Sequence, residues 1–339
     1  MLYLLALPLL IILGVLIFLL LQPGEINVRR SLRIRCTPED AFEQVRDQRG
    51  WRKWSPWLLH EPGAQLSYSE APSEPGGWYA WNGQRIGAGC ITHVALHPPA
   101  RIEQRIDVKR PLKLTGAVSW ELVPTEQDGA PATDVHWTLR GRMPFLLRFL
   151  APMLSQLIGK DFQLGLVRLR ALLDPAAPKL EIRLPGTTEL PAQTALTIGF
   201  NGGVKDMAQA MEAGFGRIRA ALAERGVEPT GPAFTAYYLA APKAGRFRCD
   251  IAVPVPAGTE AGELAVKDLP GGPCQATEVA GSYDFLDLAW HAVMAHLRIT
   301  KRQWDRSRPA LEVYVSGPES VAGDDALMTH IYVPIKAKS

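Results

Sequence analysis

The sequence predicts an α+β protein with two folded domains behind an apolar N-terminal helix. Three patterns lead to this prediction: an uncharged run over residues 2–21, a series of short alternating segments that ends in a long amphipathic segment, and a strand-helix-strand-strand plan that occurs twice in the C-terminal half. A chain of 339 residues exceeds what one hydrophobic core usually organises, so two domains are expected.

The uncharged run over residues 2–21 has the length of about 20 residues that a helix needs to span a bilayer. A cleaved signal peptide is the alternative, but the run lacks a basic start and a small-residue exit. We therefore expect residues 1–22 to form a single-pass membrane anchor. Four arginines follow the run, and their charge bias places the folded domains in the cytoplasm unless they simply face outward on a first strand: Arg29, Arg30, Arg33 and Arg35.

Residues 26–174 are predicted to form the first domain. After a first strand, Thr37 is the expected cap of a short helix with Pro38 at its first position. Short alternating segments typical of an antiparallel meander follow at 65–70, 77–82, 89–97, 100–108, 114–124 and 133–142. An amphipathic pattern from Pro144 to Leu173 predicts one long helix that closes the domain.

The second domain is predicted over residues 180–339, after a stiff proline-rich linker at 174–178. Its first half contains a strand, a helix and two strands, with the first strand at 190–199 and the helix at 203–225 before Gly226. The second half repeats this plan, with its helix at 282–299. The halves also end alike, so we infer an internal duplication with pseudo-twofold packing: Val253-Pro254-Val255 and Val333-Pro334-Ile335.

The first domain carries a set of short motifs: Thr37 to Asp40, Asp47 with Trp51, the run Trp54 to Trp57, Trp81 with Gly83, and Gly87-x-Gly89. On these motifs it resembles the START-like, polyketide-cyclase-type superfamily, also called SRPBCC. The resemblance implies a helix-grip fold, in which a curved antiparallel sheet wraps a long C-terminal helix around an apolar cavity, but no shared reaction. The tryptophans either line such a cavity or fill the core, and core packing is the expected role of large aromatic residues.

The second domain also carries recognisable motifs: Gly231-Pro232-x-Phe234-x-x-Tyr237, Leu269-Pro270-Gly271-Gly272, Gly281-x-Tyr283, Leu311-Glu312-Val313-Tyr314 with Pro318, and Thr329-x-x-Tyr332-Val333-Pro334-Ile335. On these it is similar to the gyrase-inhibitor-like, AraC-type effector-binding domain, which is also found fused to multidrug-sensing transcription regulators. The resemblance implies small-molecule binding in an aromatic pocket between two repeats, with the glutamate of the Glu-x-Tyr strand at the bottom.

Carried over to this sequence, the resemblance assigns Glu312 as the ligand-binding acid, surrounded by Tyr237, Tyr283 and Tyr332. Tyr314 joins them because alternate residues of a strand share one face. From the residues alone, a solvated sheet face is the commoner position for Glu312, and the tyrosines fit an ordinary core; the resemblance favours the pocket instead. If the glutamate is buried among phenols, it forms a receptor for an apolar cation, since burial of the anion is costly and tyrosine rings attract cations.

Several partner classes are not expected. The net charge is only +3 and no helix-turn-helix or zinc-finger spacing occurs, so nucleic acid is an unexpected partner and the regulators' transcriptional role does not transfer. The four cysteines form no CxxC or Cys/His pattern, so neither a metal nor a cofactor is predicted, and disulfides stay open. Two histidines, His291 and His330, lack a partner at ligand spacing and are interpreted as structural. His93 and His97 are four residues apart, which would align ligands on a helix, but they fall on a predicted strand and are interpreted as non-ligands.

The predicted function is a membrane-anchored binding protein that captures lipophilic small molecules, cations among them, at Glu312. The alternative is a hydrolase or cyclase that acts on an electrophilic lipophilic compound, with Glu312 as general base beside Tyr283 as proton donor. A third possibility is a structural or partner-binding module whose pockets are sealed. The sequence identifies no protein partner.

Overall fold

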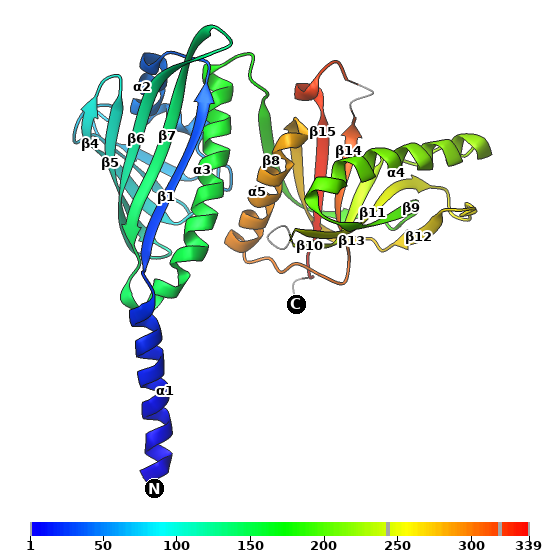
Figure 1. Ribbon diagram of the computed structural model, residues 1–339, viewed down its shortest axis with the longest axis horizontal. Helices are drawn as coiled ribbons and strands as arrows, with labels where there is room; N and C mark the ends of the chain where they lie inside the picture. The colour runs from blue at the N-terminus through cyan, green and yellow to red at the C-terminus, as the bar shows by residue number, and fades with distance from the viewer. Residues whose placement is uncertain (1, 242–244, 318–320, 338–339) are drawn as a thin grey trace. The chain divides into compact units, whose positions relative to one another are not determined.

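The computed structural model describes residues 2–241, 245–317 and 321–337, without the side chains of residues 2–9, 11, 12 and 239–241. Pro318 of the Glu312 motif lies outside the described residues. The chain divides into two compact units, Met1–Ala177 and Pro178–Ser339 (Figure 1). Each is an antiparallel sheet combined with helices, so the predicted α+β class is confirmed.

The predicted membrane anchor is not supported. Helix α1 spans Leu2–Leu21. Within the described part of the chain, no helix is both long enough and apolar enough to cross a membrane. The prediction that residues 1–22 form a single-pass anchor is therefore wrong, and so is the placement of the domains in the cytoplasm that was derived from it.

The first unit is built on a seven-stranded antiparallel sheet in the order β1-β7-β6-β5-β4-β3-β2. Its strands are β1 (Glu25–Ile34), β2 (Gln65–Tyr68), β3 (Trp78–Asn82), β4 (Ala88–His97), β5 (Arg101–Arg110), β6 (Leu114–Gln127) and β7 (Ala130–Arg142). β2 to β7 form the predicted meander. Strand β1 closes it by pairing with β7 from Glu25↔Arg142 to Ile34↔Thr133.

The short helix α2 (Pro38–Arg46) starts as the sequence predicts. The Thr37 hydroxyl accepts a hydrogen bond from the Asp40 backbone N–H at 3.1 Å, and Pro38 occupies the first turn. This bond satisfies one of the free N–H groups that every helix start exposes. The other face of α2 is buried through Ala41, Phe42 and Val45.

Replacing Thr37 by alanine is expected to destabilise the first unit by about 1 kcal/mol, because the cap bond is lost while the buried face of α2 is unchanged. Chemical denaturation of the whole chain measures this as a shift of the first unit's transition. Thr37→Ser, which keeps the hydroxyl, is the matched control. A Thr37→Ser variant as unstable as Thr37→Ala would contradict the capping role.

The long helix α3 begins later than predicted. It covers Ala151–Leu173, and the preceding residues Phe145–Leu150 form a separate 3-10 turn, η2. Pro152 lies in the first turn of α3, where its missing N–H removes no intrahelical hydrogen bond. Helix α3 then runs along β1 (Figure 1).

Tryptophans fill the core of the first unit. Trp51, Trp54, Trp120 and Trp137 are almost completely buried. The Trp137 ring stacks on Phe162 of α3 at a centroid distance of 3.8 Å and on Trp120 at 4.3 Å. These rings pack against one another, which confirms the expected core role for Trp51 and Trp54 and fixes α3 to the sheet.

The second unit is built on an eight-stranded antiparallel sheet in the order β12-β9-β11-β10-β14-β15-β13-β8. Its strands are β8 (Leu180–Leu190), β9 (Gln193–Gly202), β10 (Phe234–Ala241), β11 (Arg246–Val255), β12 (Ala265–Leu269), β13 (Gly272–Gly281), β14 (Ala310–Ser316) and β15 (Met328–Pro334). The helices are α4 (Val204–Arg225) and α5 (Leu286–Ile299), with a 3-10 turn η4 (Tyr283–Phe285) before α5. Gly226 ends α4 in the left-handed conformation, as predicted.

The strand order shows the duplication. β9-α4-β10-β11 and β13-α5-β14-β15 follow one plan, and the two halves meet where β10 pairs with β14. The edge strands β8 and β12, which the sequence analysis missed, each precede one half but pair with the other half, β8 with β13 and β12 with β9. This exchange is what a pseudo-twofold axis at the β10–β14 seam produces.

The two faces of this sheet differ. One face packs against α4 through Ile218 and Leu222, which contact Leu196, Ile251 and Val253. The other face holds a second apolar cluster that includes Phe234 and Leu311. Because successive strand residues alternate between faces, the residue after Leu311 points to the helix-covered side.

Candidate functional site

Glu312 lies in the interior of the second unit, at the seam between the two half-domains. It pairs with Thr235 of β10 on one side and Ile331 of β15 on the other. Its exposed fraction is only 3%. The structure therefore places Glu312 on the helix-covered face of the sheet and not on a solvated one.

Three neutral groups donate hydrogen bonds to this carboxylate. The Trp290 indole Nε1–H of α5 donates to Oε2 at 2.5 Å. The Tyr314 and Tyr237 hydroxyls donate to Oε1 at 2.7 and 3.5 Å. No lysine, arginine or histidine among the described residues forms an ion pair with Glu312, so its charge is met by dipoles alone.

The two halves of the site are related by the pseudo-twofold symmetry, but one half carries a charged residue where the other carries a neutral one. Phe234-x-x-Tyr237 and Leu311-x-x-Tyr314 occupy matching places on β10 and β14, so Thr235 and Glu312 are equivalent residues that face each other across the seam. Each tyrosine bonds across the seam: Tyr237 to Glu312, and Tyr314 to Thr235 at 3.0 Å. One half thus contributes a hydroxyl where the other contributes an acid.

Burial sets the electrostatics of the site. Desolvation raises the pKa of Glu312 above its ordinary value, while hydrogen bonds from Trp290, Tyr314 and Tyr237 oppose the rise. Burial and then the nearby Glu312 charge raise the pKa of Tyr237 and of Tyr314 well above that of free tyrosine. Both phenols therefore remain protonated donors at any physiological pH.

Aromatic rings surround the carboxylate. Tyr314 lies 5.5 Å from Tyr283 of η4 and 5.7 Å from Phe215 of α4, centroid to centroid. Tyr237 packs edge-on against Trp290 at 5.6 Å. Burial and the charge of Glu312 raise the pKa of Tyr283 to about 12. Of the residues that the sequence assigned to the site, Glu312, Tyr237, Tyr283 and Tyr314 come together.

Tyr332 does not join them. It pairs with Leu311 in the sheet and so points to the opposite face, where it packs on the second apolar cluster. Its hydroxyl lies 3.1 Å from Nδ1 of His330. The family motif placed Tyr332 on the right strand, but the side of a strand that a residue faces depends on register, which spacing alone does not give.

Trp290 is the functional residue that sequence reasoning missed. It is seven residues after Tyr283 in the predicted helix at 282–299, and residues seven apart lie on one helix face. That spacing was the available signal. Met207 of α4, whose sulfur is 3.9 Å from the Tyr237 hydroxyl, gave no comparable signal.

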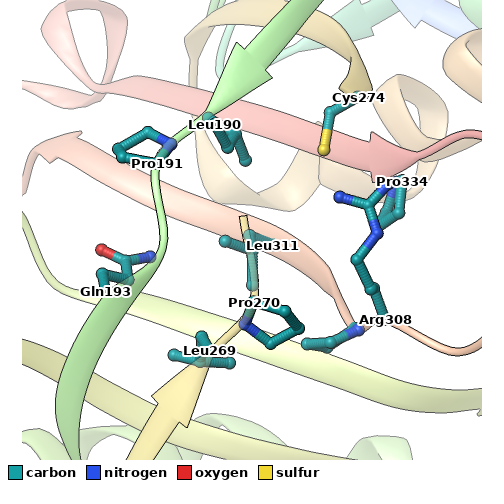
Figure 2. Close-up of a pocket in the computed structure, with 10 residues that line it drawn as sticks. Leu190, Pro191, Gln193, Leu269, Pro270, Cys274, Arg308, Leu311 and Pro334 are labelled. Atoms are coloured by element: carbon teal, nitrogen blue, oxygen red, sulfur yellow. The ribbon is translucent and has the colours of Figure 1, made fainter. Parts of the chain in front are cut away.

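A pocket of about 300 Å³, which includes open solvent, lies on the other side of the sheet. Figure 2 shows it around Leu311, Pro270 and Arg308. The Arg308 guanidinium donates to the carbonyls of Gly271, Pro273 and Ile335 and to the Asp305 carboxylate. Arg308 therefore joins the β12–β13 turn to β15, and the pocket does not reach Glu312, which faces the helices.

Cysteines and histidines are the other residue types in the chain that could bind a metal ion. Among residues with described side chains, no three His, Cys, Asp or Glu groups are close enough to hold a metal ion. All four cysteines are free thiols, so no disulfide links them. In the first unit His93 is buried, contacts the Arg46 carbonyl and Gln104, and has its pKa lowered by burial.

Two protein-family models match the chain. One, described as polyketide cyclase / dehydrase and lipid transport, matches residues 25–174. The other, described as a GyrI-like small molecule binding domain, matches residues 186–336. The chain joins a polyketide cyclase-type domain to a GyrI-like domain. Both predicted resemblances, and their order, are thereby confirmed, and the GyrI-like domain is of a small-molecule-binding type.

Several solved structures are similar to part of the chain. Protein CV1439 from Chromobacterium violaceum is 16% identical with a TM-score of 0.33, over 44% of this chain and 98% of its own. The EcmrR C-terminal domain is 16% identical at 0.39, over 48% and 99%. SAV2435 bound to tetraphenylphosphonium is 14% identical at 0.35, over 47% and 94%. A search of curated proteins found no match.

Proposed function

We propose that the GyrI-like domain of this chain captures lipophilic cations, with Glu312 as the residue that recognises the charge. One observation carries the proposal: the carboxylate is 3% exposed and accepts hydrogen bonds from neutral donors only. An ionised group in such surroundings is costly without a counter-charge. A cationic ligand supplies that counter-charge. Its binding is favoured because it removes the free-energy cost of the buried, unpaired carboxylate.

The surrounding rings favour an apolar cation over a hydrated one. Tyr283, Phe215 and Trp290 present aromatic surface near the carboxylate. A cation over an aromatic face gains about 0.5 to 2 kcal/mol per ring, with more at desolvated sites. A delocalised or shielded charge loses little hydration on entry, so quaternary ammonium and phosphonium compounds fit this chemistry best.

The alternative of base catalysis has weaker support. A general base must reach a proton on substrate or water, yet both oxygens of Glu312 already accept hydrogen bonds. Tyr283, the proton donor of that alternative, packs on Tyr314 and makes no hydrogen bond to Glu312 among the described contacts. Several product equivalents from an electrophilic lipophilic compound would nevertheless establish turnover.

Titration with tetraphenylphosphonium tests the proposal through its pH dependence. Protonated Glu312 has no charge to offer, so affinity is expected to rise up to tenfold per pH unit until the pH exceeds the raised pKa of Glu312, and to level off above it. Isothermal titration calorimetry in buffers of different ionisation enthalpy should also show proton release within the rising range.

The matched control is triphenylphosphine oxide, which carries three of the same rings and no net charge. Its affinity should not rise over this range. Equal affinities for the charged and neutral compounds, or a flat pH profile for tetraphenylphosphonium, would contradict recognition by the ionised glutamate.

A further inference from the structure

The acid at the centre of the site is enclosed by the protein's own donors. Trp290 donates to Oε2, and the two tyrosines donate to Oε1. Because Glu312 is only 3% exposed, a ligand cation can reach the carboxylate only after one donor moves. The three donors differ in how firmly they are held, and this difference identifies the one that moves.

Both tyrosines belong to the rigid centre of the sheet. Tyr314 is two residues from Glu312 on the same strand, and its oxygen also accepts a hydrogen bond from the Thr235 hydroxyl, since its single proton goes to Glu312. Tyr237 lies on the paired strand β10 and is 8% exposed. Moving either ring would disturb the β10–β14 seam.

Trp290 is held differently. It lies on α5, is only half-buried, and makes one hydrogen bond, the one to Oε2. The 3-10 turn η4 before α5 is capped by the Ser282 hydroxyl, so the helix itself is well held. The Trp290 indole can nevertheless leave Oε2 by a change of side-chain rotamer, which breaks one hydrogen bond and moves no strand.

We propose that Trp290 is an internal stand-in for the ligand's charge: its indole N–H occupies Oε2 in this structure and leaves the carboxylate when a lipophilic cation binds. The inference rests on the proposed function of Glu312 and adds a regulatory step to it. Trp290 and the ligand compete for Oε2. A ligand therefore binds only if its interaction with the carboxylate is more favourable than the indole hydrogen bond that it replaces. A ligand with neither a positive charge nor a hydrogen-bond donor cannot compensate for the lost indole bond.

The variant Trp290→Phe separates this role from that of a plain pocket wall. Phenylalanine keeps an aromatic ring but has no N–H to compete with the ligand. If Trp290 is a stand-in, the variant should bind tetraphenylphosphonium about tenfold more tightly than wild type at a pH above the pKa of Glu312. If Trp290 only contacts the ligand through its ring, the variant should bind more weakly than wild type, because indole is the better cation–π surface. The matched control is Trp304→Phe, the other tryptophan of the second unit, which should leave affinity unchanged.

A second readout uses the unmodified chain. In an NMR spectrum of ¹⁵N-labelled protein, the Trp290 indole proton, assigned by its contacts to the Tyr237 ring, is expected far downfield because of its short bond to a carboxylate. Saturation with tetraphenylphosphonium should return it to the position of an indole without such a bond. This measurement also decides the question if Trp290→Phe does not fold.

The outcomes distinguish the two proposals. If the wild-type chain binds tetraphenylphosphonium with the expected pH dependence, but Trp290→Phe binds less tightly or the indole proton stays downfield at saturation, the stand-in is overturned and Glu312 recognition stands. If the wild-type chain shows no pH-dependent binding, the proposed function itself fails, and Trp290 is a structural partner of a buried acid.

Discussion

Replacement of Glu312 by glutamine is expected to weaken binding of tetraphenylphosphonium about 100-fold, or about 2.7 kcal/mol, at a pH above the pKa of Glu312. The substitution removes one charge and almost no volume. The rings of Tyr283 and Phe215 stay in place, so the residual affinity measures the apolar and cation–π contribution of the pocket. Isothermal titration calorimetry gives both values under one set of conditions.

Glutamine suits the network well enough to keep the fold. Its oxygen accepts from the Trp290 indole, which can only donate, and its amide donates to the tyrosine hydroxyls, which can turn to accept. Tyr314 then donates to Thr235, its partner across the seam. A loss of affinity in Glu312→Gln therefore reports on charge and not on local unfolding.

The same substitution should stabilise the protein without ligand. The fold raises the pKa of Glu312 above its value in the unfolded chain, so Glu312 favours folding fully below the unfolded value, and this contribution is lost as pH rises through the folded value. Glutamine does not titrate. The difference in unfolding free energy between Glu312→Gln and wild type should grow with pH across that window, to about 1 kcal/mol.

The control for both measurements is Glu189→Gln, which changes an exposed glutamate of the same unit. It should alter neither affinity nor the pH dependence of stability. If Glu312→Gln binds tetraphenylphosphonium as tightly as wild type does, or loses stability at high pH, then Glu312 is a structural acid and the cation model is wrong.

The sequence located the acid and three of the four tyrosines predicted around it, but not Trp290. The Glu-x-Tyr motif and the duplication were enough to select Glu312, Tyr237 and Tyr314, because alternation along a strand sets which residues share a face. Tyr332 went to the other face because its strand is paired in a register that spacing does not reveal. Trp290 reaches Glu312 through helix packing, which is a tertiary contact without a local motif.

The fold shows the same division between local and long-range causes. The Thr37 cap and the Gly226 stop were predictable because each depends on a few neighbouring residues. The edge strands β8 and β12 were not, because each is held by pairing with a strand of the opposite half-domain.

The largest stability loss is expected in the first unit, from Trp137→Ala. The Trp137 ring is 1% exposed and stacks between Trp120 on the sheet and Phe162 on α3. Its removal leaves a cavity that neighbouring rings cannot fill without leaving their own contacts, and large-to-small changes of this kind cost about 4 kcal/mol. Denaturant unfolding should show an early transition of the first unit and an unchanged transition of the second.

Two comparisons test whether this loss of stability comes from the stacking of Trp137 on Trp120 and Phe162. Trp78→Ala removes a half-buried tryptophan from the same sheet and should cost much less, since part of its side chain is already exposed to solvent. Free indole, which matches the deleted group, should bind the Trp137→Ala cavity and restore part of the stability, because a ligand that binds only the folded state shifts unfolding by mass action. Equal losses in both variants, or no response to indole, would show that Trp137 does not hold α3 on the sheet through its ring.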